Sequence, residues 1–144
     1  MSLWTDHAQA ALRHAGHRSG SARAAVIDLL GRERCCRSAQ ELHEVLHSAG
    51  RPVGVASVYR TLDLLAELGL VNRVEVGDGV ARFERAEPGG EHHHHLVCGE
   101  CGRVEAFEDE PLERAIHGLA ARVSYALAGH DVVLRGSCEE CRAA

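Results

Sequence analysis

The sequence predicts an α+β protein composed of two small domains. Three observations support this: helical spacing of apolar residues as far as Leu68, two-residue alternation beginning at Val71, and two Cys-x-x-Cys pairs after Val97. A chain of 144 residues is long enough for two domains of about 85 and 55 residues. Domains of that size have thin cores and usually need a metal ion, a disulfide or a partner subunit to be stable.

Four helices are predicted in the first part of the chain. Ser21 and Gly31 have the residue types that open and close the second helix. Ser38 and Glu41 have the spacing of a capping box at the start of the third helix, which Gly50 ends. The apolar residues indicate helices over residues 4–15, 21–31, 39–49 and 56–68.

The pattern then changes to short strands. Residues 71–76 and 80–85 alternate as strands and are joined by Gly77-Asp78-Gly79, which is a strong hairpin signal. Helices followed by a hairpin are typical of a winged helix, whose last helix enters the DNA major groove. A generic small α+β domain is the alternative.

The predicted domains are a winged-helix DNA-binding domain (residues 1–86), a hinge (87–91) and a metal-binding domain (92–144). The hinge is the segment Glu87-Pro88-Gly89-Gly90-Glu91. The last domain is expected to contain short strand-like segments, a helix over 111–123 and a strand over 131–134.

Targeting signals are not evident. No run of about 18 apolar residues could span a membrane, and the segment after Met1 lacks the basic and apolar regions of a signal peptide. We therefore expect a cytoplasmic protein. In that reducing compartment, six cysteines are interpreted first as metal ligands or redox sensors.

The charge is distributed unevenly along the chain. Residues 1–72 contain eight Arg and seven acidic residues, hence +1, whereas residues 73–144 contain eight Arg and fourteen acidic residues, hence −6. These values add to the net charge of −5. Basic residues are densest in the first 37 positions, which suits contact with phosphate.

The clearest motif is a pair of knuckles, Cys98-x-x-Cys101 and Cys138-x-x-Cys141. Two such knuckles make a tetrahedral thiolate cage for structural Zn²⁺ and leave no open position for catalysis. The alternative is unpaired core or redox-active cysteines. With zinc bound, the cage would fasten the C-terminus back onto the small domain.

A run of four histidines, residues 92–95, precedes the first knuckle. On a strand, His92 and His94 would face one way and His93 and His95 the other, so one run could supply two separate sites. Surface histidines without a metal are the alternative. By residue type the candidate partners, which spacing leaves unassigned, are Cys35, Cys36, His43, Glu84, Glu113, His117 and His130.

From about residue 12 to 142 the chain resembles ferric-uptake-regulator (Fur) family proteins, with several motifs in family order and at family spacing. These motifs are Ser38-Ala39-Gln40-Glu41-Leu42, Ser57-Val58-Tyr59-Arg60-Thr61-Leu62, His92 to Cys98, Cys101-Gly102 and Cys138-x-x-Cys141. The resemblance implies a metal-dependent DNA-binding repressor of metal homeostasis genes, not an enzyme. Its implied partners are a second copy of the chain and double-stranded DNA with a pseudo-palindromic operator, without membrane or small organic substrate.

The resemblance also implies three metal sites. The structural zinc ligands are Cys98, Cys101, Cys138 and Cys141. A site within the dimerisation domain would use His92, His94, Glu113 and His130. A hinge sensing site would use Cys36, Glu84, His93 and His95.

The hinge site departs from the family pattern in two places. Cys36 stands where the family usually has a His, and Ala106 stands where some relatives have an acid, with Glu105 on the other face. One thiolate, one carboxylate and two imidazoles suit Zn²⁺ better than Fe²⁺. A zinc-responsive, zinc-uptake-regulator-like member is therefore predicted, with iron-responsive and peroxide-sensing members as alternatives. Cys35 is interpreted as structural or incidental.

The family resemblance also implies DNA-contacting residues. Tyr59 and Arg60 occupy the DNA-facing positions of the fourth helix, and Ser57 could bind phosphate at its start. Arg18 and Arg23 are further candidates for phosphate contact. A zinc hydrolase is the rival from another class. The sequence contains one HExxH match, His43-Glu44-Val45-Leu46-His47, but its two histidines are interpreted as helix-surface or core residues rather than ligands.

Overall fold

A computed structural model describes residues 2–18, 20–87 and 93–144, and the chain forms two compact units, Met1–Glu91 and His92–Ala144. Most of the predicted hinge, along with His92, lies outside the described residues. No helix in the described ranges has the length and apolar character needed to cross a bilayer.

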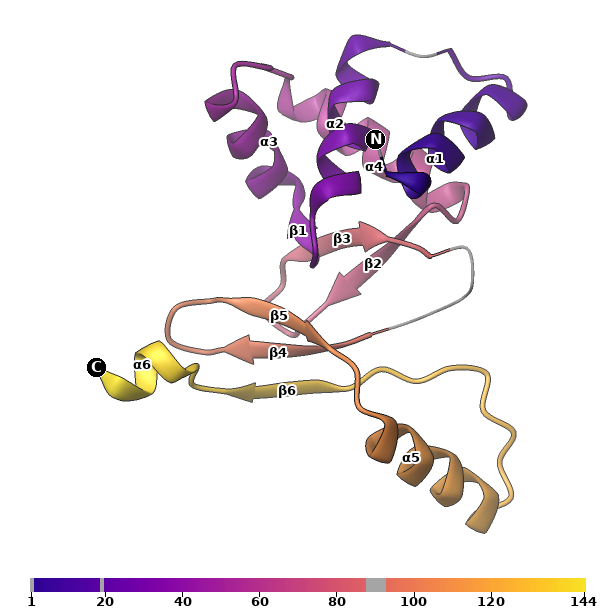
Figure 1. Cartoon of the computed structure of the whole chain (residues 1–144), viewed down its shortest axis with the longest axis vertical. Helices are drawn as coiled ribbons and strands as arrows, with labels where there is room; N and C mark the ends of the chain where they lie inside the picture. The colour runs from indigo at the N-terminus through magenta and orange to yellow at the C-terminus, as the bar shows by residue number, and fades with distance from the viewer. Residues whose placement is uncertain (1, 19, 88–92) are drawn as a thin grey trace. The chain divides into compact units, whose positions relative to one another are not determined.

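Unit 1 has four helices, near the predicted positions: α1 (Leu3–His14), α2 (Ser21–Arg32), α3 (Ala39–Ser48) and α4 (Val55–Glu67) (Figure 1). Their apolar stripes meet in one core, because residues at helical spacing face the same side. Its most buried side chains include Val26, Leu30, Leu42, Val58, Leu62 and Leu65. Trp4 adds a buried hydrogen bond from Nε1 to the Leu70 carbonyl, 3.0 Å long.

The predicted capping box is present at α3. Ser38 Oγ accepts the Glu41 amide at 3.1 Å, and Glu41 Oε2 accepts the Ser38 amide at 2.8 Å. After α3, Gly50 has a φ of +73°, which favours glycine at a helix end.

The prediction that Gly31 ends α2 is wrong. Gly31 is buried inside the helix, which continues to Arg32. A Cβ at this position would lie 2.2 Å from Thr5 Oγ1 of α1. The glycine therefore permits the close approach of α1 and α2 rather than closing a helix.

A three-stranded antiparallel sheet completes unit 1. The predicted hairpin is present as β2 (Val71–Glu75) and β3 (Ala81–Arg85), and β3 also pairs with the two-residue β1 (Arg37–Ser38), giving the order β1-β3-β2. Strand β1 was not predicted, because two residues are too few to show alternation.

Unit 2 is a second three-stranded sheet with two helices, α5 (Glu110–Arg122) and α6 (Glu139–Ala143). Strand β4 (His94–Cys98) lies between β5 (Val104–Phe107), antiparallel to it, and β6 (Val133–Gly136), parallel to it (Figure 1). The terminal helix α6 was not predicted. Among the described residues of this unit, the buried ones are His94, His95, Cys98 and Ala120.

Truncating Leu62 to Ala should destabilise unit 1 by about 2–5 kcal/mol, because the side chain is fully buried and its removal leaves a cavity. The matched control is Leu3→Ala, since Leu3 is 90% exposed; its effect should stay within about 0.5 kcal/mol. Urea unfolding followed by circular dichroism measures both. Equal effects of the two substitutions would contradict the assigned core.

Candidate metal centres and nucleic-acid interface

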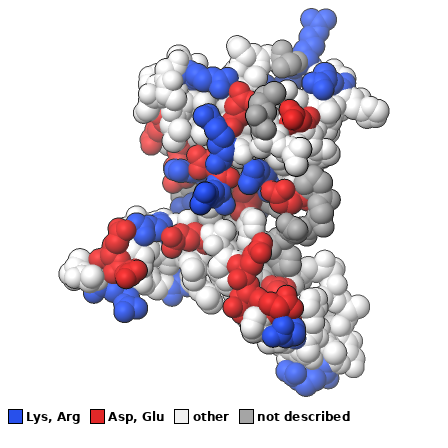
Figure 2. All heavy atoms as spheres, in the orientation of Figure 1, with Lys and Arg blue, Asp and Glu red and all other residues white. Residues whose placement is uncertain are grey.

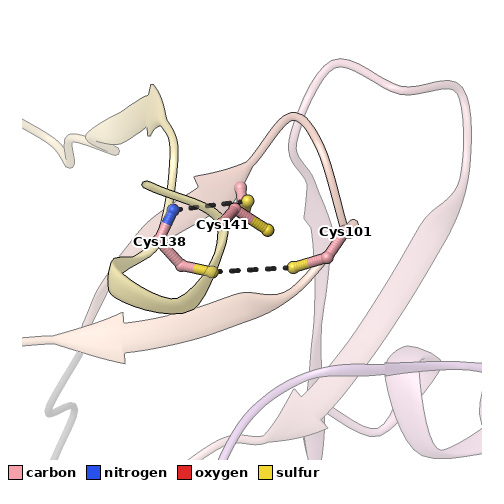
Figure 3. Close-up of side chains that lie close together, drawn as sticks. Cys101, Cys138 and Cys141 are labelled. Carbon is pink, nitrogen blue, oxygen red and sulfur yellow. Dashed lines mark hydrogen bonds between the residues drawn. The ribbon is translucent and has the colours of Figure 1, made fainter. Parts of the chain in front are cut away.

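The four cysteines of the two knuckles converge in unit 2. Their Sγ atoms all lie within 4.8 Å of one another. The Sγ atoms of Cys101 and Cys138 are 3.8 Å apart, facing each other (Figure 3). Cys101 follows the end of β4 and Cys138 follows β6, so the cluster joins two segments far apart in the sequence.

This cluster fits Zn²⁺. Zinc–thiolate bonds of about 2.3 Å in a tetrahedron place neighbouring sulfurs about 3.8 Å apart. Backbone amides, first that of Cys101 and then that of Cys138, lower the pKa of the Cys98 thiol to about 6. The Cys138 and Cys98 side chains raise the pKa of Cys141 to about 12. A cation is therefore needed to hold all four sulfurs as thiolates.

A second cluster in unit 2 contains His94, Glu113 and His130. The two carboxylate oxygens of Glu113 lie 2.5 Å from His94 Nε2 and 2.8 Å from His130 Nε2. Hydrogen bonds, that with His94 first, lower the pKa of Glu113. Two imidazoles and a carboxylate are a suitable donor set for Zn²⁺ or Fe²⁺. The fourth predicted ligand, His92, lies outside the described residues.

The predicted hinge ligands occur as two pairs, one in each unit. In unit 1, Cys36 and Glu84 are both buried, and their ligand atoms lie within 4.8 Å of each other. The antiparallel register pairs Arg37 with Phe83; continued by one residue, it places Cys36 opposite Glu84. The Cys35 thiol, followed by burial, raises the pKa of Cys36 far above its usual value, so without a cation this thiol stays protonated.

In unit 2, the rings of His93 and His95 lie 6.2 Å apart, edge to face. His94 instead contacts Glu113, as the predicted alternation requires. Sequence reasoning missed Glu108, whose Oε1 lies 3.7 Å from His93 Nδ1. The pairing of His94 with Phe107, continued by one residue, places Glu108 opposite His93. Glu108 lies two residues beyond Ala106 and hence on the same strand face, a signal that was available in the sequence.

The predicted DNA-contacting residues of α4 lie in its first two turns. Tyr59 and Arg60 are exposed. Val58, which precedes Tyr59 and follows Ser57, is fully buried. The Arg60 guanidinium donates to Ser57 Oγ at 3.1 Å. An exposed tyrosine and arginine on a helix whose other face is anchored in the core can reach base edges and phosphates.

The other predicted phosphate contacts lie near the start of α2. Arg18 is exposed, and Arg23 Nη1 donates to the Arg18 carbonyl at 2.6 Å. In unit 2, by contrast, acidic side chains gather over the start of α5 and beside α6 (Figure 2). The charge distribution therefore favours unit 1 as the DNA-binding unit.

Comparison with known proteins gives consistent matches. The family model described as "Ferric uptake regulator family" matches residues 14–135. The chain is 36% identical over 119 residues to the ferric uptake regulation protein of Bacillus subtilis, covering 82% of this chain and 80% of that protein. It is also 36% identical over 129 residues to the zinc uptake regulation protein of Mycobacterium tuberculosis, covering 89% and 97%.

Solved structures support the same fold. The ferric uptake regulator of Vibrio cholerae matches with a TM-score of 0.77 and 34% identity over 89% of this chain and 97% of that chain. The Helicobacter pylori regulator Fur matches in fold, with a TM-score of 0.82 at 24% identity over 96% and 91%.

Fold and sites together define a metal-responsive transcriptional regulator, not an enzyme: an N-terminal winged helix precedes a C-terminal dimerisation domain with a four-cysteine zinc site. The chain belongs to the ferric uptake regulator family. The predicted fold class, family membership and zinc cofactor are thereby confirmed, and regulators of this family are dimeric DNA-binding proteins.

Replacing Cys138 with Ser should remove the structural zinc, since a serine hydroxyl is a poor zinc ligand. Zinc sites of this kind contribute about 10–16 kcal/mol of apparent binding free energy, so residues 92–144 should lose their fold. Elemental analysis of zinc per chain and a thermal melt measure this. The neighbouring Ser137→Ala, at an exposed position, should match the parent. Full zinc content and an unchanged melt in Cys138→Ser would argue against the four-cysteine site.

Proposed function

We propose that the chain is a zinc-responsive repressor of metal homeostasis genes, acting in the cytoplasm as a homodimer on a pseudo-palindromic operator. The observation that carries the zinc assignment is Cys36, a buried thiol close to the Glu84 carboxylate. A thiolate in the ligand set favours Zn²⁺ over Fe²⁺, which prefers nitrogen and oxygen ligands.

The proposed regulation is a shift between conformational populations. If Cys36 and Glu84 of the reader domain share one cation with His93 and His95 of the dimerisation domain, as the family resemblance implies, the two reader helices of a dimer acquire a fixed separation. Only matching separations fit an operator whose half-sites are spaced by helical turns. Cation binding and operator binding then strengthen each other by the same factor.

An iron-responsive regulator is the second candidate. Glu108 beside His93 adds an oxygen donor close to the predicted sensing ligands, as Fe²⁺ prefers. The relatives named for ferric and for zinc uptake regulation are both 36% identical to this chain, so overall identity favours neither metal. The peroxide-sensing alternative would start from bound iron beside His93 or His95.

The discriminating experiment is fluorescence anisotropy of a labelled operator duplex, titrated with the protein at buffered free Zn²⁺ or, anaerobically, free Fe²⁺. Zinc should activate binding at the lower free concentration, because a thiolate-containing site binds zinc tightly. Activation by Fe²⁺ alone would refute the zinc assignment and support the second candidate.

His93→Ala provides the matched test of the sensing ligands. A coupling free energy of about 1–3 kcal/mol between a metal site and a DNA site changes DNA affinity roughly 5–150-fold. The zinc-dependent operator affinity of His93→Ala should therefore fall by about that factor while the dimer remains folded. His14→Ala, at an exposed position in the last turn of α1, is the control and should bind like the parent. Parent-like affinity of His93→Ala, with and without zinc, would rule out the proposed hinge coupling.

A further inference from the structure

Two adjacent thiols lie between α2 and β1. Cys36 is buried and Cys35 is half-buried, and their Sγ atoms are 3.8 Å apart. Adjacent side chains in an extended strand point to opposite faces, but this pair precedes β1, where the chain bends and both sulfurs can turn to one side. By residue type Cys35 is one of several candidate ligands, but its spacing in the sequence does not assign it to a site.

The separation is the one that a shared cation requires. Sulfurs that bind one tetrahedral zinc at about 2.3 Å lie about 3.8 Å apart. Cys101 and Cys138 of the structural site show the same 3.8 Å distance. The vicinal thiols therefore already have the spacing of two ligands of one ion.

The surroundings of the pair also suit a cation. The ligand atoms of Cys35, Cys36 and Glu84 all lie within 4.8 Å of one another. Two thiolates and a carboxylate carry three negative charges. A bound divalent cation would therefore leave one negative charge unbalanced. Arg82 stands two residues before Glu84 on β3, hence on the same face of that strand.

Arg82 is buried, and its guanidinium can balance the remaining negative charge. Its Nη2 pairs with Asp78 at 2.8 Å, whereas its Nη1 is buried and has no hydrogen-bond partner within the described part of the chain. A buried guanidinium with an unused donor is costly unless negative charge lies nearby. A cation-loaded dithiolate would provide such a charge.

We propose that Cys35 is a second thiolate ligand, so that Cys35, Cys36 and Glu84 form a dithiolate half-site for soft or borderline divalent cations within unit 1. This inference rests on the proposed zinc response and deepens it, because a second sulfur strengthens discrimination against Fe²⁺ and admits Cd²⁺. Metal selectivity is then built into the reader unit itself.

The test uses Co²⁺ as the probe, added to the full chain carrying one equivalent of zinc, with a phosphine keeping the thiols reduced. Co²⁺ binds the same ligands less tightly than Zn²⁺ and so leaves the four-cysteine site filled. Sulfur-to-cobalt charge transfer absorbs in the near ultraviolet in proportion to the number of bound thiolates, whereas histidine and carboxylate ligands contribute no sulfur band.

The band should fall to about half in Cys35→Ser and in Cys36→Ser and vanish in the double variant. Arg34→Ser, the exposed neighbour, is the control and should keep the full band. A full band in Cys35→Ser with loss in Cys36→Ser would overturn the inference and leave the zinc-response proposal standing. No sulfur band in the parent would overturn the inference and also remove Cys36 from the proposed sensing ligands.

A measurement on the unaltered chain guards against misfolded variants. Alkylation of each cysteine, followed by mass spectrometry of peptides, reports whether Co²⁺ covers the Cys35 thiol. Bound Co²⁺ should slow alkylation of Cys35 at least tenfold. An unchanged rate at Cys35, with protection at Cys36, would contradict the dithiolate half-site.

Discussion

Residues 92–144 must be held together by something other than an apolar core, because their buried residues within the described range are two histidines, one cysteine and one alanine. A unit of this size that buries so little apolar surface within one chain is not stable by its own packing and needs a metal ion or a partner subunit. The four-cysteine cluster supplies one such constraint inside the chain. It connects the turn after β4 to the segment after β6, and the parallel pairing of those two strands depends on that connection.

Strand β4 also determines which way the histidines beside the four-cysteine cluster face. Since side chains alternate on β4, His94 joins Glu113 and His130 while His93 and His95 point elsewhere. In unit 1, the short β1–β3 pairing positions the proposed metal ligands, because its register places Cys36 opposite Glu84. Under the proposed function, these two pairs are parts of one ligand set, and the cation that they would share links metal availability to DNA binding.

Much of this was predictable from local signals. Helical spacing, the Ser38–Glu41 box and the glycine-flanked Asp78 turn each act over a few residues, and the paired knuckles have the ligand spacing of a known zinc site. What the sequence could not supply depends on tertiary contact. Gly31 was predicted to end a helix, and only its packing against α1 shows why a glycine is needed there. Cys35 was interpreted as structural or incidental, and only the structure shows its sulfur beside that of Cys36.

The most direct test of the central claim is hydrogen–deuterium exchange of the full chain with and without a zinc chelator. Loss of zinc should deprotect the amides of β4 and β6, whereas the core helices α2 and α4, stabilised by apolar packing, should keep their protection. Unchanged protection of β4 and β6 in zinc-free protein would contradict the claim that a cation, not a core, holds unit 2 together.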